Sequence, residues 1–297
     1  MHAHFELMWF YLALSSALLS AAAAIFEKRV LFKTGALSFS FLLALFNAVF
    51  SLPFLFFIDL SAVTLTTYLY VALKSLLGSI SFLLVMSGIK RLELSSALPL
   101  LVLTPGLVAV FAWIFLGDKL TGPEIFGMIL LLAGTYMLQT GGFSNLLKPL
   151  RITFIKKGYW YIVGALAVFT LTSLLDKWLL SSYRLSPEVF LPLQHFFMAL
   201  FFTAFAATGK VLRQALHVDL KKVWRLVLVV AVVTILYRYA HIWAVKTGAV
   251  ALALSVKRTS VFFAALIGGY IFKEERLVFK AVAISVMVFG AIMVIFD

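Results

Sequence analysis

Residues 116–138 read LGDKLTGPEIFGMILLLAGTYML, and the polar start of this stretch separates two long apolar runs. A related junction, FKEER, stands at residues 272–276 and is again enclosed by apolar runs. Moving the first junction 156 positions along the chain, from 118 to 274, places Asp118 on Glu274. A junction of the same type at two distant points indicates an internal repeat.

Further matches support the repeat. The shift of 156 also places Gly134 on Gly290, and a shift of 149 places Glu27-Lys28 on Asp176-Lys177. The two shifts differ by seven residues, which one loop insertion explains. Because all these matches keep their order along the chain, we expect the second half to repeat the first.

The composition indicates a membrane protein. Hydrophobic residues make up 64% of the 297 residues and charged residues only 12%, against about 25% charged residues in a typical soluble domain. About 20 apolar residues span the hydrocarbon core as a helix. Ten segments approach this length, and we predict a transmembrane helix in each: 8–28, 37–58, 64–88, 95–116, 124–140, 159–180, 187–208, 224–245, 249–271 and 279–296.

The predicted fold is an all-α polytopic membrane protein with ten transmembrane helices arranged as two inverted five-helix repeats. Residues 1–140 form the first repeat, 141–158 a basic linker loop and 159–297 the second repeat. Because each repeat holds an odd number of helices, the second one enters the membrane from the opposite face. Inverted repeats are a common design of secondary transporters, with the substrate site at the repeat interface.

Both junctions resemble the EamA type of the drug/metabolite transporter superfamily, in which a helix is followed by Gly-Glu-basic and then by a helix with a late Gly. The resemblance rests on residues 116–138 and, more closely, on KTGAVALALSVKRTSVFFAALIGGYIFKEERLVFKAVAISVMVFGAIMVI at 246–295. It implies a ten-helix permease that transports or exports metabolites. Position 118 departs from the pattern, since it holds Asp where Glu is usual.

The net charge of +13 predicts an orientation. Seventeen of the 25 Lys and Arg residues lie in loops after odd-numbered helices and three in loops after even-numbered helices. Basic loops remain cytoplasmic, so we expect both termini outside, although many relatives keep both inside. The basic residues are thus expected to set topology in the inner (cytoplasmic) membrane rather than to bind nucleic acid.

Basic residues inside the apolar segments are the first candidates for a substrate site. A Lys or Arg at the centre of a membrane helix costs about 2.5–3.5 kcal/mol on insertion scales. Such residues usually line a cavity. Lys74, Arg238, Lys257 and Arg258 all lie deep in their predicted segments. No acidic residue in the eighth or ninth helix lies at similar depth, so we expect an anion from outside the protein to neutralise the last three. The Lys-Arg pair also resembles the sugar-phosphate and nucleotide-sugar branches of the superfamily, where it meets phosphate.

Polar and aromatic residues extend this candidate site. Tyr237, Tyr239 and His241 flank Arg238 in the eighth helix, and we predict that they bind substrate, although aromatic packing is the plain alternative. His195 in the seventh helix has either a substrate or proton role or a packing role. Two carboxylates are candidates for coupling or for counter-ions to Lys74 or Arg238, or they pair with the lysine beside each near a helix end: Glu27 and Asp176.

Two prolines flank the centre of the fourth segment. Pro99 and Pro105 each remove one backbone donor and are able to kink the helix, which either lines a cavity with freed carbonyls or only shapes packing.

Enzyme chemistry is not expected. The chain has no cysteine, no Cys-His metal spacing, no paired catalytic carboxylates in one segment and no phosphate-cradling loop. We therefore predict neither a metal nor a cofactor. The expected partners are a small-molecule substrate and the lipid bilayer, with proton or counter-substrate coupling, in a monomer or homodimer.

The sequence favours a secondary transporter of a small anionic metabolite that bears a carboxylate or phosphate. An exporter of amino acids, drugs or lipid-linked groups within the same fold is the alternative. A non-transporting membrane partner or receptor is the third class, against which the buried basic residues argue because scaffolding gains nothing from their cost.

Overall fold

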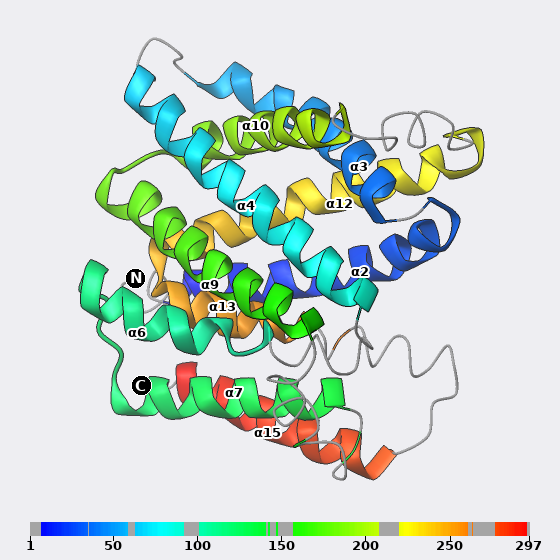
Figure 1. Cartoon of the computed structure of the whole chain (residues 1–297). Helices are drawn as coiled ribbons and strands as arrows, with labels where there is room; N and C mark the ends of the chain where they lie inside the picture. The colour runs from blue at the N-terminus through cyan, green and yellow to red at the C-terminus, as the bar shows by residue number, and fades with distance from the viewer. Residues whose placement is uncertain are drawn as a thin grey trace.

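Hydrophobic runs of this length in lipid must satisfy their own backbone hydrogen bonds, and helices do so. The computed structural model describes residues 7–34, 36–58, 63–91, 101–140, 142, 147, 157–207, 220–260, 263 and 277–295. Within these residues there is no strand and there are ten α-helices, one in each predicted segment (Figure 1). They are α2 (Met8–Thr34), α3 (Ala36–Ser51), α4 (Leu65–Arg91), α6 (Thr104–Leu116), α7 (Gly122–Thr140), α9 (Lys157–Lys177), α10 (Pro187–Ala207), α12 (Leu220–Thr247), α13 (Val250–Arg258) and α15 (Leu277–Ile295).

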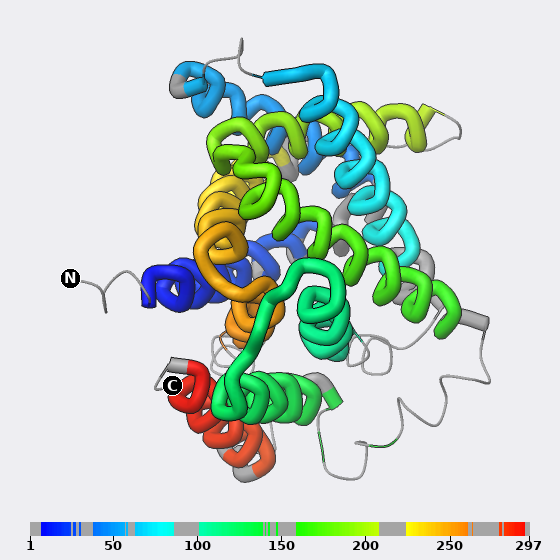
Figure 2. The backbone as a smooth tube through the Cα atoms, turned by 90° about the vertical axis from the view of Figure 1, so that its left-hand side faces the viewer, coloured from blue at the N-terminus to red at the C-terminus, as the bar shows by residue number. Residues whose placement is uncertain are grey.

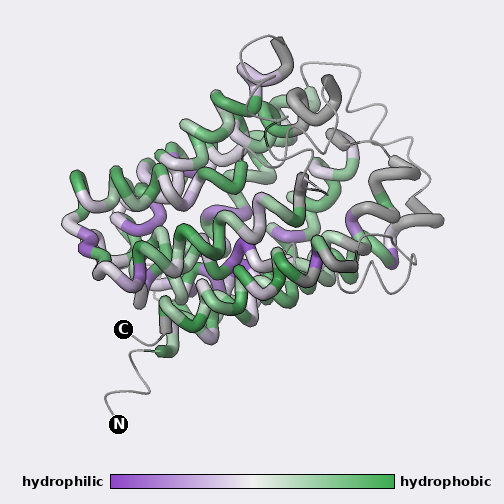
Figure 3. The backbone as a smooth tube through the Cα atoms, turned by 90° about the horizontal axis from the view of Figure 1, so that it is seen from below, coloured by the Kyte–Doolittle hydropathy of each residue, from purple (hydrophilic) through white to green (hydrophobic). Residues whose placement is uncertain are grey.

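The helices have the length and apolar character of membrane spans. Five stretches of the described chain are long and apolar enough to cross a bilayer: Ser38–Phe56, Leu65–Val85, Tyr159–Ser182, Pro187–Ala207 and Trp224–Thr247. Shorter apolar helices are Met8–Ala24, Thr104–Leu116, Gly122–Leu138 and Val282–Val294. Seen from below, the helices are mostly hydrophobic, with short hydrophilic stretches both near the middle of the bundle and at its edges (Figure 3).

Several helices depart from the predicted segments. The fourth segment is interrupted by a turn at residues 102–103, and α6 begins at Thr104 with Pro105 in its first turn. Pro105 therefore starts a helix rather than kinking the middle of one, as its fixed φ and missing N–H favour. Pro99 lies outside the described residues. The ninth segment is described as α13 and a few residues after it, and 264–276 lie outside the described residues as well.

The first helix is longer than predicted, which corrects the position of Glu27. The hydropathy signal ends near residue 28 because Lys28 and Arg29 follow, but these residues are good helix formers and α2 continues to Thr34. Glu27 is therefore almost two turns away from the helix end. Asp176 is the penultimate residue of α9, but the chain continues from there as a π-helix over Trp178–Ser182.

Helices from the first half pack on helices from the second half. α2 packs against α12 and α4 against α9, while α3 pairs with α10, α6 with α13 and α7 with α15. In the predicted repeat, each helix of the first half has a counterpart in the second half: α2 and α9, α3 and α10, α4 and α12, α6 and α13, and α7 and α15. Replacing every helix by its counterpart gives the same set of packed pairs. The contacts α2–α13 and α6–α9, and α10–α4 and α3–α12, obey the same rule. The packing thus has an internal two-fold pattern.

The pair α7 and α15 lies along one edge of the bundle in both side views (Figures 1 and 2). A Cβ on Gly127 would lie 2.6 Å from the carbonyl oxygen of Gly290, and one on Gly290 would lie 2.7 Å from that of Gly127. A Cβ on Gly134 would lie 2.7 Å from the carbonyl oxygen of Ala283. The residue numbers rise along one helix and fall along the other, so the two helices are antiparallel. Small residues allow this close approach.

Candidate substrate-binding site

Lys257 and Arg258 occupy the last turn of α13, which packs against α12. The Nζ of Lys257 lies 5.1 Å from the ring centroid of Tyr237, and Arg238 is the next residue along α12. An ammonium over a phenol ring is a favourable cation–π contact. The local sequences Tyr237-Arg238 and Lys257-Arg258 are therefore brought together by helix packing.

The positive charges around Lys257 act on one another. Lys257 is repelled by Arg238, Arg258 and Lys74 and attracted by Asp176. In the part of the chain that the structure describes, one ion pair forms, between Lys74 and Asp176. Arg238, Lys257 and Arg258 thus have no carboxylate of a described residue within ion-pair distance. Cations in an apolar environment are costly without a counter-ion, so these three side chains favour the binding of an anion.

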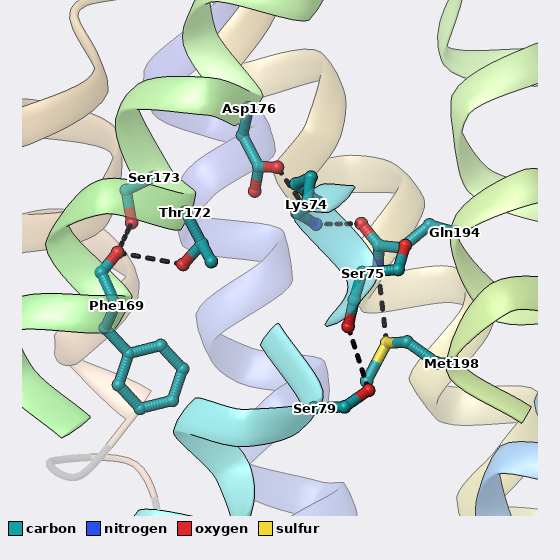
Figure 4. Close-up of polar contacts among 9 residues, drawn as sticks. All are labelled: Lys74, Ser75, Ser79, Phe169, Thr172, Ser173, Asp176, Gln194 and Met198. Atoms are coloured by element: carbon teal, nitrogen blue, oxygen red, sulfur yellow. Dashed lines mark hydrogen bonds and ion pairs between the residues drawn. The ribbon is translucent and has the colours of Figure 1, made fainter. Parts of the chain in front are cut away.

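Lys74, by contrast, is neutralised by the protein. It lies in α4 with 4% of its surface exposed, and its Nζ is 2.9 Å from Oδ1 of Asp176 in α9. The same ammonium donates a hydrogen bond to Oε1 of Gln194 in α10 (Figure 4). It also lies 4.9 Å from the ring centroid of Phe190. Asp176 is therefore the counter-ion of Lys74, and the pair joins the first half of the chain to the second.

Two buried histidines border the charged groups. His195 in α10 and His241 in α12 are 3% and 6% exposed, and each interacts electrostatically with Arg238 and Lys74. Nε2 of His195 and Nδ1 of His241 have no hydrogen-bond partner among the residues that the structure describes. Buried polar atoms are normally bonded, so these two nitrogens are available to a ligand.

Tyr237 links the cluster to the first helix. Its carbonyl oxygen accepts a hydrogen bond from Oγ of Ser16 in α2 at 2.8 Å, and its phenol interacts electrostatically with Glu27 of the same helix. Glu27 is half-buried and forms no ion pair with a described residue. The carboxylate and the cationic cluster thus border the same side chain. We call Arg238, Lys257, Arg258, Tyr237 and Glu27 the central charge cluster.

Tyr239 is the predicted site residue that the structure places elsewhere. Its hydroxyl donates to Oε1 of Glu188 at 2.6 Å, and its ring lies 5.0 Å from that of Phe54. Two residues along a helix correspond to a rotation of about 200°, so Tyr237 and Tyr239 face opposite sides of α12. That both rings select the substrate stays a prediction, in which Tyr239 would act from the Glu188 side of α12 and not from the side of Lys257.

A second polar group holds the turn between α12 and α13, residues 245–250, which we call the α12–α13 turn. Nζ of Lys177 donates to the carbonyl oxygens of Val245 at 3.2 Å and Gly248 at 2.6 Å. Oδ2 of Asp118 accepts from the backbone N–H of Val250 at 3.3 Å. A cation thus meets the C-terminal end of α12 and an anion the N-terminal end of α13, as the helix dipoles favour.

The same end of the bundle contains an aromatic contact between the two halves. The Tyr183 ring packs on Tyr70 and Trp178, and its hydroxyl lies 2.9 Å from Oγ1 of Thr67. Hydrogen bonds with Thr64 and Thr67 lower the pKa of the Tyr183 phenol below its usual value. The loops after even-numbered helices are therefore held by specific contacts between the halves.

Sequence reasoning missed some residues. Gln194 and Ser75 are buried beside the Lys74–Asp176 pair (Figure 4), and the only available signal was an uncharged polar residue within an apolar run. Asn47 in α3 is buried with its Oδ1 unbonded, and α3 packs on the helix that carries His195. Among the described residues, no group of three His, Cys, Asp or Glu is placed to hold a metal ion.

Comparison with known proteins agrees with this architecture. Residues 7–140 match the EamA-like transporter family. No curated protein matches the chain. A solved structure described as "Crystal structure of protein" is similar with a TM-score of 0.72 and 16% sequence identity, over 96% of this chain and 96% of that chain. At this identity the likeness concerns the fold alone.

The family match confirms the resemblance to the drug/metabolite transporter superfamily that residues 116–138 carry. Members of the family are transporters rather than enzymes, and they are multi-pass membrane proteins. Residues 7–140, a little less than half of the chain, are thus similar to the EamA-like transporter family of polytopic membrane transporters.

Proposed function

We propose that the protein is a secondary transporter that moves a small anionic metabolite, bearing a carboxylate or phosphate, by alternating access. The single observation that carries the proposal is the group of cations at Arg238, Lys257 and Arg258, without a carboxylate of a described residue to neutralise it. Each such charge costs about 2.5–3.5 kcal/mol to insert on translocon scales. A bound anion offsets that cost, whereas a scaffold would gain nothing from it.

The packing of the helices supports the alternating-access part of the proposal. The internal two-fold pattern and the antiparallel α7–α15 pair are what two inverted five-helix repeats, 1–140 and 159–297, would produce. Rocking of one repeat against the other around a central site moves a substrate without moving the site far. In this proposal the Lys74–Asp176 pair and the α12–α13 turn are contacts between moving parts.

The experiment is transport by purified protein in liposomes. We expect Lys257→Ala and Arg258→Ala to abolish flux of the anion while the protein still inserts and elutes as a single species. Lys119→Ala is the matched control, because Lys119 is an exposed lysine in the loop before α7. Normal flux in both cluster variants would show that the cations do not bind the substrate.

Glu27 favours a second candidate, an exporter of amino acids, drugs or lipid-linked groups in the same fold. A half-buried carboxylate without an ion-pair partner among the described residues suits a cationic or zwitterionic group. In that case Glu27→Gln should abolish transport and Lys257→Ala should leave most of it. Measuring both variants with anionic and cationic metabolites separates the two candidates.

A further inference from the structure

The charges of the central charge cluster do not cancel. Lys74 and Asp176 neutralise each other. Arg238, Lys257 and Arg258 then contribute three positive charges, against one negative charge on Glu27. Among the described residues of the cluster, two positive charges therefore remain.

The charged side chains of the central charge cluster are close enough to interact electrostatically, so they form one site and not several separate ones. Lys257 interacts electrostatically with both Arg238 and Arg258. Tyr237, whose ring Lys257 covers, interacts electrostatically with both Glu27 and Arg238. The charged side chains of the cluster are half-buried, and partly buried charges that are close together are screened less by salt than exposed ones, so a ligand meets their sum.

We propose that the site selects its substrate by charge number and is built for a small metabolite with two negative charges. This inference rests on the proposed function, which requires only an anion. A monoanion would leave one positive charge without compensation in an apolar environment. A dianion removes the excess completely, whether the charges belong to one phosphate monoester or to two carboxylates.

The uncharged groups define the rest of the ligand. His195 and His241 each have a ring nitrogen without a hydrogen-bond partner among the described residues, and both interact electrostatically with Arg238. Such atoms recognise hydroxyl or amide groups, because leaving them unpaired is costly. The ligand is therefore a polar dianion with hydrogen-bonding groups rather than a lipophilic acid.

The test uses pairs of probes that differ in charge but little in shape. Methyl phosphate is compared with dimethyl phosphate, and succinate with monomethyl succinate, by equilibrium binding to the full-length protein at a pH at which the phosphate monoester is doubly ionised. We expect the dianion to bind at least about tenfold more tightly than its capped partner in one of the two pairs. The pair that shows the effect identifies phosphate or carboxylate as the anionic group.

Charge variants test whether the net charge of the central charge cluster sets the preference for a dianion. Lys257→Gln leaves one positive charge, so the preference for the dianion should fall towards a ratio of one, and Arg238→Gln should do the same if the first variant fails to fold. Glu27→Gln leaves three positive charges and should increase the preference. Lys119→Gln, outside the cluster, should leave the ratio unchanged.

The outcomes separate this inference from the proposed function. Equal binding of dianion and monoanion by the wild-type protein, or an unchanged ratio in Lys257→Gln and Arg238→Gln, overturns charge-number selection while anion binding stands. Failure of every anion to bind, with binding of a cationic or zwitterionic probe, overturns the proposed function itself.

Discussion

Lys74 and Lys257 are both lysines inside membrane helices, but their surroundings give them different roles. The Lys74 ammonium has a carboxylate, an amide oxygen and an aromatic ring around it. The Lys257 ammonium has the Tyr237 ring, the repulsion of other cations and an attraction to Asp176 that does not amount to an ion pair. The first residue is therefore expected to hold the fold, and the second to hold a ligand.

The Lys74–Asp176 pair provides a prediction at the scale of the residue. Lys74→Met alone leaves a buried carboxylate without its partner, which typically costs about 3–5 kcal/mol of stability. The double variant Lys74→Met/Asp176→Leu removes both charges and should recover most of this loss. The measurement is the thermal unfolding of the detergent-solubilised protein. A double variant less stable than both single variants would contradict the pairing as the source of the loss.

At the scale of the element, the approach of α7 and α15 depends on missing side chains. Gly290→Val should force the helices apart and cost about 1–3 kcal/mol, as overpacking generally does. Gly78→Ala in α4 is the control, because a Cβ there meets no atom within 4 Å and helix propensity favours Ala by about 0.5–1 kcal/mol. The thermal unfolding temperature should therefore be lower for Gly290→Val than for the wild-type protein, and it should not be lowered by Gly78→Ala.

The α12–α13 turn gives another prediction for an element. Lys177→Met removes the donor to two carbonyl oxygens, and Asp118→Asn removes the charge at the start of α13. Cations at helix ends contribute up to about 2 kcal/mol when partly buried, so both variants should loosen the turn. Because the chain has no cysteine, Ala249→Cys is a unique reporter of this loosening.

The reporter is read as the rate of maleimide labelling. We expect labelling of Ala249→Cys to become faster when Lys177→Met or Asp118→Asn is added. Lys119→Met, next to Asp118 but exposed, should leave the rate unchanged. Equal rates in all backgrounds would mean that the two charges do not hold the turn.

At the scale of the whole molecule, the loops at opposite ends of the bundle differ in charge. The excess of Lys and Arg after odd-numbered helices predicts that this end faces the cytoplasm and that both termini are outside. A reporter that is active only in the cytoplasm should be inactive at the C-terminus and active when inserted in the loop 141–158. The reverse result would mean that the habit of many relatives overrides the charge bias.

Much of the architecture could be predicted from the order of the residues. Transfer of apolar side chains into lipid depends on local composition, so ten segments and their approximate limits followed from hydropathy. Limits were wrong where other forces decide them: α2 extends beyond its apolar run, and Pro105 begins α6. The predicted repeat agrees with the antiparallel α7–α15 contact, in which Gly134, one of the matched glycines, lies against Ala283.

The sequence by itself determined that this is a helical membrane protein, where its helices run, and that uncommon charges lie within them. Only the tertiary structure decided which charges are neutralised, because Lys74 and Asp176 meet through packing of helices from different halves. It also separated Tyr237 from Tyr239 and gave Lys177 and Asp118 their places at helix ends. Hydropathy depends on neighbours along the chain, whereas the fate of a buried charge depends on neighbours in space.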